Sequence, residues 1–124
     1  MGGNISRKFI GFKNLIEPGD IAAIKIHTNK LEEEIGSVGS YDVSRAVNLD
    51  PGYICKSKLI LATTKDYSHR IYLQKGIFAE ITLKYNSKSS SYQYQPWTFP
   101  DYRTWDYIEF FNNVRNGYLT KLRI

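Results

Sequence analysis

The stretch "HRIYLQKGIFAEITL", residues 69–83, decides the fold because it has the pattern of a complete β-hairpin. Strand-forming residues stand on both sides of Gln-Lys-Gly, and the glycine can take the left-handed conformation that a tight turn requires. A three-residue loop then sets the register of the two strands. The predicted cross-strand pairs are Leu73 with Ile77, Tyr72 with Phe78, Ile71 with Ala79, Arg70 with Glu80, and His69 with Ile81. Since neighbours on a strand point to opposite faces, this register separates His69 from Arg70.

Upstream of the hairpin, the sequence predicts an amphipathic helix over residues 18–36, with Pro18 near its start and Gly36 at its end. Its apolar positions recur at steps of three and four: Ile21, Ile24, Thr28, Leu31 and Ile35. A second stripe of Lys25, Asn29 and Glu32 follows the edge of the apolar one. These polar groups either form an ordinary solvent boundary or point into a cleft.

Downstream, a second helix is predicted over residues 104–122, with Thr104 as its N-cap. Its apolar face would carry Ile108, Phe111, Val114, Tyr118 and Leu122. Before it, "YQYQ" (92–95) alternates like a strand, and two prolines make "PWTFPDY" (96–102) irregular.

The remaining segments are harder to assign. Residues 5–12 and 45–50 have the pattern of short strands. Over residues 53–64, Asp50 before Pro51 favours a helix, whereas the β-branched character of "LILATT" favours a strand. We expect a helix there. The whole chain then predicts an α+β fold, an antiparallel sheet covered on one face by the two main helices.

Composition narrows the class of protein. The 124 residues suit a single domain, and no apolar run is long enough to span a bilayer, so we expect a cytoplasmic protein. The only cysteine, Cys55, fits a reducing compartment and is expected to be a buried thiol. The net charge of +5 is spread along the chain, which makes a nucleic-acid partner unlikely in comparison with a small anion. No metal site is predicted, and the sequence identifies no cofactor.

The segment 63–70 carries the candidate chemistry. His69 has the side chain best suited to proton transfer near neutral pH, and Asp66 is a nearby carboxylate that could tune it. The alternative is a core histidine whose ring nitrogens are bonded to backbone groups. Arg70 is either the cross-strand partner of Glu80 or an anion clamp, and Lys65 stays free to meet an anion.

Four blocks together resemble a bacterial family of unknown function whose members are often labelled GTP-binding proteins: "NLDPGY" (48–53), "LATTKDYSHRIYL" (61–73), "GIFAEITL" (76–83) and "WTFPDYR" (97–103). The resemblance implies no established activity, and the glycine-rich sequence that cradles nucleotide phosphates is absent. Family members look longer at the N-terminus, so the single domain over residues 1–124 would lack an N-terminal portion. A bare sheet edge, and a homodimer formed through it, would follow. The matching polar positions are Asn48, Asp50, Thr64, Lys65, Asp66, Ser68, His69, Arg70, Trp97, Asp101 and Arg103.

Two classes of function fit these residues. In the first, the protein binds or acts on a small anionic ligand, phosphorylated or nucleotide-like, in a pocket where the 63–70 loop meets residues 97–103. Lys65 with Arg70 or Arg103 would neutralise the ligand, and His69 or Asp66 would move protons; Ser68, Asn48, Asp50 and Asp101 are further ligand-binding candidates by resemblance. In the second, aromatic residues of segment 96–105 contact a protein or nucleic acid, which predicts a contiguous patch of exposed rings.

Overall fold

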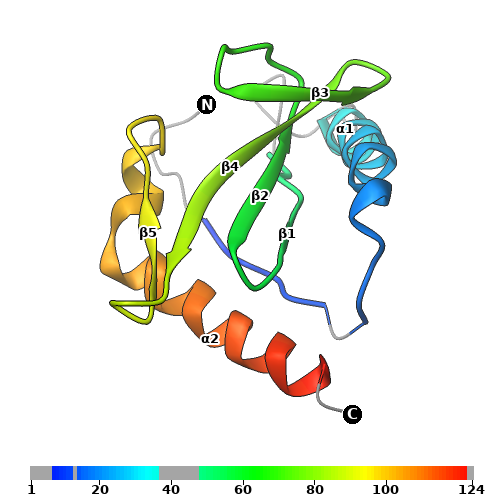
Figure 1. Cartoon of the computed structure of the whole chain (residues 1–124). Coiled ribbons are helices and arrows are strands. Elements are labelled where there is room, and N and C mark those ends of the chain that lie inside the picture. The colour runs from blue at the N-terminus through cyan, green and yellow to red at the C-terminus, as the bar shows by residue number, and fades with distance from the viewer. Residues whose placement is uncertain (1–6, 13, 37–47, 123–124) are drawn as a thin grey trace.

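The computed structural model describes residues 7–12, 14–36 and 48–122, and within them an antiparallel sheet of five strands with two α-helices (Figure 1). In chain order the elements are the 3₁₀ turn η1 (Pro18–Asp20), α1 (Ile21–Gly36), β1 (Gly52–Ile54), β2 (Lys58–Thr63), β3 (Arg70–Gln74), β4 (Ile77–Asn86), β5 (Ser91–Tyr94), the 3₁₀ turn η2 (Pro100–Arg103) and α2 (Trp105–Leu122). The predicted α+β class and both predicted helices are confirmed.

Strand β4 organises the sheet because three other strands pair with it. β2 pairs along one edge of β4, from Phe78 to Lys84. β3 and β5 therefore share the other edge, with β3 on residues 77–80 and β5 on residues 83–86. Between them, at Ile81 and Thr82, no strand pairs with that edge among the described residues. The β2–β4 register shifts at the same level, as expected for a β-bulge.

The hairpin register was predicted correctly along most of its length. Arg70 pairs with Glu80, Ile71 with Ala79, and Tyr72 with Phe78. At the turn the prediction was wrong, because Gln74, and not Leu73, pairs with Ile77. The loop has two residues, Lys75 (φ 53°) and Gly76 (φ 79°), as in a type I′ turn, and Leu73 is absorbed in an irregularity. His69 lies just before the first residue of β3, outside the predicted pairing with Ile81.

The predicted helix over residues 53–64 was wrong, since β1 and β2 occupy this segment as an antiparallel pair. Gly52 shows the reason, because a Cβ there would lie 2.4 Å from the carbonyl oxygen of Ile60. The backbones of β1 and β2 approach too closely for a side chain at that position. Cys55 in the connecting turn is partly exposed, which corrects the expectation of a buried thiol.

The two short N-terminal strands were also predicted wrongly within the described residues. Neither 7–12 nor 48–50 pairs with another strand. Residues 5–6 and 45–47 lie outside the described part of the chain. Segment 7–12 is instead fixed by Phe9, which packs against four aromatic rings: Tyr102, Tyr107, Phe110 and Phe111.

Each helix has a core cluster of its own. α2 packs with β2, β4 and β5 in a cluster of Leu59, Leu83, Tyr92, Tyr102, Ile108 and Phe111. α1 packs at the other end of the sheet in a smaller cluster of Ile21, Ala22, Ala62 and Ile77. In Figure 1, α1 lies near the β3–β4 turn and α2 near the β4–β5 turn. This separation leaves the C-terminal half of α1 free of the main core.

The burial pattern of α1 corrects the predicted apolar face. Ile35 is 37% exposed, while Lys25 and Glu32 are 7% and 6% exposed. The helix therefore buries its polar stripe as well as Ile21 and Ala22. In α2 the prediction is confirmed at Thr104, whose hydroxyl accepts the N–H of Tyr107 (3.4 Å) as an N-cap.

Candidate functional site

A cavity of about 760 Å³ opens between α1, the end of β2, the segment after β2, and η2. Cavities of roughly 300 to 1,000 Å³ are the usual size of small-molecule sites. Residues 63–70, from the end of β2 to the start of β3, contribute Thr63, Thr64, Lys65, Tyr67 and Arg70, and across from them lie Phe99, Pro100, Asp101 and Tyr102. A pocket therefore exists where residues 63–70 meet residues 97–103.

The cavity brings together only part of the predicted set. Its lining includes Asn48, Asp50, Lys65, Arg70 and Asp101. The other four predicted residues, Asp66, Ser68, His69 and Arg103, do not line it. The lining also contains residues that were not predicted as site residues, mainly Arg7, Lys25, Asn29, Glu32, Glu33 and Phe99.

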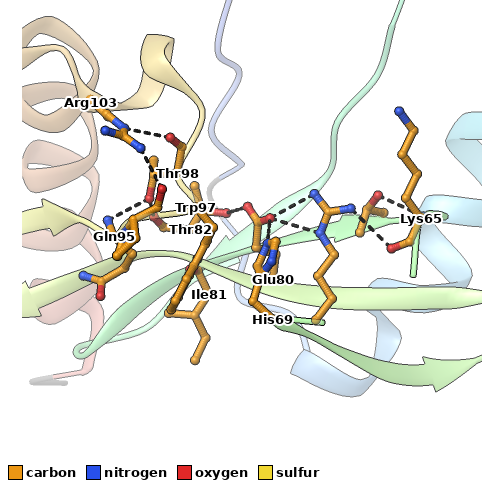
Figure 2. Close-up of polar contacts among 12 residues, drawn as sticks. Lys65, His69, Glu80, Ile81, Thr82, Gln95, Trp97, Thr98 and Arg103 are labelled. Atoms are coloured by element: carbon orange, nitrogen blue, oxygen red, sulfur yellow. Dashed lines mark hydrogen bonds and ion pairs between the residues drawn. The ribbon is translucent and has the colours of Figure 1, made fainter. Parts of the chain in front are cut away.

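The floor of the cavity contains a buried carboxylate, Glu80, which is 2% exposed (Figure 2). Its Oε1 atom accepts from Nε and Nη2 of Arg70, at 3.0 and 2.9 Å, and lies 2.7 Å from Nε2 of His69. Its Oε2 atom accepts the hydroxyl of Thr82 at 2.9 Å. Burial raises the pKa of Glu80, but the hydrogen bonds from His69, Thr82 and Arg70 outweigh burial and lower it. Glu80 is therefore a carboxylate at neutral pH.

Arg70 is held by this carboxylate and in turn holds the loop before β3. Its side chain is 5% exposed, and Nη1 donates to the carbonyl oxygen of Lys65 at 3.3 Å. The guanidinium also stacks over the ring of Tyr67, 4.3 Å from its centroid. Arg70 thus pairs with Glu80, as the hairpin register required, and acts as a fixed support for Lys65.

His69 meets the same carboxylate from outside the cavity. Since a carboxylate can only accept, Nε2 of His69 must donate to Glu80. The imidazole stacks on the indole of Trp97, with centroids 5.1 Å apart and planes 19° apart, and its side chain is 20% exposed. His69 is thus bonded to a side chain, and not to backbone groups as the core alternative assumed. Asp66 makes no hydrogen bond or ion pair with it within the described residues.

The turn after β5 fills the unpaired stretch of the β4 edge. Trp97 Nε1 donates to the carbonyl oxygen of Ile81 at 2.7 Å, and the Thr98 hydroxyl donates to that of Thr82 at 2.6 Å (Figure 2). Thr98 Oγ1 also accepts the N–H of Gln95 at 2.8 Å. These bonds replace the ladder that a continuous strand would have supplied.

Arg103 braces the same turn instead of facing the cavity. Its Nε donates to the carbonyl oxygen of Thr98 at 2.8 Å, and Nη2 donates to that of Pro96 at 2.9 Å. The guanidinium lies over the ring of Tyr94 at 4.9 Å. A structural role accounts for Arg103 without a ligand.

The buried polar stripe of α1 fixes another wall of the cavity. Lys25 Nζ donates to the carbonyl oxygen of Leu49 at 3.2 Å, and Glu32 accepts the N–H of Leu49. Leu49 is thus bonded to α1 through both its N–H and its C=O. Its neighbours Asn48 and Asp50 line the cavity as a result. Of the two alternatives for this stripe, the cleft is the one observed, and its spacing on the helix was the available signal.

The charged groups of the cavity are nearly balanced, but they are not all paired. Arg7 lies 3.5 Å from Asp101, and Arg70 pairs with Glu80. Lys65 differs, since its ammonium makes no hydrogen bond or ion pair with any described residue. Burial raises the pKa of Tyr102 at the opposite wall, so its hydroxyl stays neutral.

Two further features, a metal-ion cluster and a membrane-spanning helix, are absent from the described part of the chain. Over residues 7–12, 14–36 and 48–122, no three His, Cys, Asp or Glu side chains gather as a metal ion would require. Within the same ranges, no helix combines the length and the apolar character needed to cross a membrane.

Comparison with known proteins identifies the family. Residues 1–118 match the family model described as Domain of unknown function (DUF4416), and the chain belongs to this family. The match does not support the GTP-binding label. No curated protein and no solved structure matches the chain significantly.

Proposed function

We propose that this member of the DUF4416 family binds a small anionic molecule in the cavity above Glu80, with Lys65 as the residue that meets the anion. The observation that carries the proposal is the unpaired ammonium of Lys65 at a cavity of about 760 Å³. A phosphorylated or nucleotide-like compound is the ligand class that we favour.

The surroundings of Lys65 support an anion contact. Its carbonyl group is held by Arg70, which is held in turn by Glu80, so the start of its side chain has a defined position. A preorganised cation binds an anion more tightly than a mobile one, because less conformational entropy is lost on binding. Lys25 adds a second positive charge in the lining, and its ammonium makes one bond to the described residues, which leaves further N–H donors.

A catalytic step is not part of this proposal. The Nε2–H of His69 donates a hydrogen bond to Glu80, and Asp66 and Ser68 do not line the cavity. A proton path from His69 to a ligand would cross Glu80, whose lowered pKa favours the ionised form. The observations favour binding over acid–base chemistry.

A thermal-shift screen tests the proposal. The panel contains inorganic phosphate, sugar phosphates and nucleotides, with GTP and magnesium included to test the nucleotide-like class. At a ligand concentration of 100 Kd, binding stabilises the native state by about 2.7 kcal/mol. We expect Lys65→Met to remove the shift and Lys88→Met, in the exposed β4–β5 turn, to keep it. Equal shifts in both variants, or none with wild type, would reject the site.

The second class of function, in which aromatic residues of segment 96–105 contact a protein or nucleic acid, has limited support. Tyr102 is 4% exposed and contributes no ring to a surface patch, whereas Trp97 is 37% exposed although its Nε1 is bonded to Ile81. Tyr94 and Trp105 are exposed and border a shallow hollow of about 350 Å³. If the thermal shift caused by the ligand is kept in Trp105→Ala and lost in Lys65→Met, the ligand binds in the cavity and not at the hollow beside Trp105.

We also propose a homodimer formed through the outer edge of β3. That edge has no partner strand among the described residues, and its side chains Ile71 and Tyr72 are 65% and 57% exposed. Between Arg70 and the turn, β3 carries no charged residue that would discourage pairing with a second copy. We also propose a cytoplasmic location, because the single cysteine fits a reducing compartment.

A further inference from the structure

A second wall of the cavity presents unbonded hydrogen-bonding groups. Asn29 and Glu33 come from α1, and Asn48 and Asp50 come from the segment that α1 holds. These four side chains make no hydrogen bond or ion pair with the described residues. They belong to elements other than the loop that carries Lys65. A ligand that meets Lys65 with an anion would therefore meet a wall rich in acceptors with another part of its structure.

This wall is held in place by bonds made behind it. Leu49 is fixed through both its N–H and its C=O, to Glu32 and Lys25. Asn48 and Asp50 flank Leu49, so their backbone positions are set before any ligand arrives. A wall organised in this way loses little entropy on binding.

The wall also indicates the chemistry of the group that it would bind. Carboxylates accept hydrogen bonds, and amides both accept and donate. Hydroxyl groups match this mixture because each can donate to Asp50 and accept from an asparagine amide. At the rim, the ring of Phe99 is 58% exposed, and Leu61 and Ala62 line the floor. These apolar surfaces suit the C–H face of a sugar ring.

We infer that the ligand is a phosphate ester of a polyhydroxylated compound, with its phosphate at Lys65 and its hydroxyl groups at Asp50 and Asn48. The inference rests on the proposed function and adds the second half of the ligand. The same chemistry has two sources, a free sugar phosphate and the ribose phosphate of a nucleotide.

Isothermal titration calorimetry with four probes tests the inference: inorganic phosphate, ribose, ribose 5-phosphate and adenosine monophosphate. Ribose 5-phosphate is expected to bind at least about tenfold more tightly than phosphate or ribose, because a hydrogen bond to a charged group has about that effect. If adenosine monophosphate binds about tenfold more tightly than ribose 5-phosphate, the ligand is a nucleotide. Equal affinity identifies a free sugar phosphate.

Two variants separate the halves of the ligand. Asp50→Asn should weaken ribose 5-phosphate about tenfold and change phosphate less than twofold, whereas Lys65→Met should weaken both. Asp106→Asn, at the exposed start of α2, is the matched control and should change neither. If binding depends on Lys65 but ribose 5-phosphate binds no more tightly than inorganic phosphate, the inference of a polyhydroxylated ligand is wrong and the proposed function still holds. Absence of any Lys65-dependent binding would overturn both.

Discussion

Two regions on either side of Glu80 differ in how their polar groups are used. On the side of the β4 edge, the turn at Trp97 and Thr98 bonds the carbonyl groups of Ile81 and Thr82. On the side of the cavity, the ammonium of Lys65 and the carboxylate of Asp50 have no bonded partner among the described residues. The two regions meet at Glu80, which bonds His69 and Thr82 as well as Arg70, the support of the Lys65 loop.

The difference separates positions that stabilise the fold from positions available to a ligand. Within the described residues, no buried side-chain polar atom lacks a hydrogen-bond partner. The polar groups without partners are thus at accessible positions, and those of Lys65, Asn48 and Asp50 line the cavity. Substitutions in the first region should change stability, and those in the second should change binding.

The largest effect on stability is expected for Glu80→Gln. Removal of the charge leaves Arg70, 5% exposed, without its counter-ion. Breaking a buried ion pair at one partner costs roughly 3 to 5 kcal/mol. Urea unfolding followed by circular dichroism measures the loss. Glu109→Gln, on the exposed side of α2, is the control and should stay within about 0.5 kcal/mol of wild type. A loss below about 1 kcal/mol for Glu80→Gln would show that the pair is not central to the fold.

The next largest effect on stability is expected at Thr98, and Thr64 in the cavity wall is its counterpart. Thr98→Val removes a hydroxyl that is 1% exposed and bonded to Thr82 and Gln95, so two backbone groups lose their partner. We expect a loss of about 2 kcal/mol in the free energy of unfolding. Thr64→Val, in the exposed cavity wall, should cost less than about 0.5 kcal/mol. Similar losses at both positions would remove the distinction between the regions.

A pH series sharpens the role of Glu80. Its pKa in the folded protein lies below the ordinary value of 4.5, so the unfolded state binds more protons at acid pH. The stability that this carboxylate contributes is fully present above about pH 4.5 and is lost as the pH falls through the lower folded value. The difference in the free energy of unfolding between wild type and Glu80→Gln should therefore become smaller at acid pH. A gap that stays constant from pH 7 to pH 3 would argue against the lowered pKa.

The smallest effect on folding is expected at the outer edge of β3. Ile71→Lys places a charge on an edge strand, which opposes pairing with another strand. The free energy of unfolding of the monomer should change by less than about 0.5 kcal/mol, because Ile71 is 65% exposed. Sedimentation velocity should show a dimer for wild type and a monomer for the variant. A monomeric wild type would rule out the proposed dimer.

Local sequence was sufficient where structure depends on neighbouring residues. The glycine of the β3–β4 turn, the proline and glycine around α1, and the threonine cap of α2 all act within a few residues. The pairing of Arg70 with Glu80 follows from the hairpin register. These were predicted correctly for that reason.

Long-range packing decided the features that local sequence left undetermined. Residues 52–54 and 58–63 form strands because β2 inserts between β1 and β4, and this insertion supports the strand preference of "LILATT" over the helix that Asp50 and Pro51 favoured. Arg103 and Trp97 have the residue types of a binding site, yet they bond backbone carbonyl groups more than four residues away in the chain. His69 and Arg70 reach one carboxylate because β3 begins only at Arg70.

The sequence by itself determined the α+β class, both helices and the hairpin, because periodicity and turn chemistry act over short distances. Only the tertiary structure decided which polar residues face the cavity. Lys25 and Glu32 reach Leu49 across 24 and 17 positions, and their burial depends on the segment that α1 packs against. A polar stripe on a helix gives the same pattern in solvent and in a cleft, so its role is set by what the fold places opposite it.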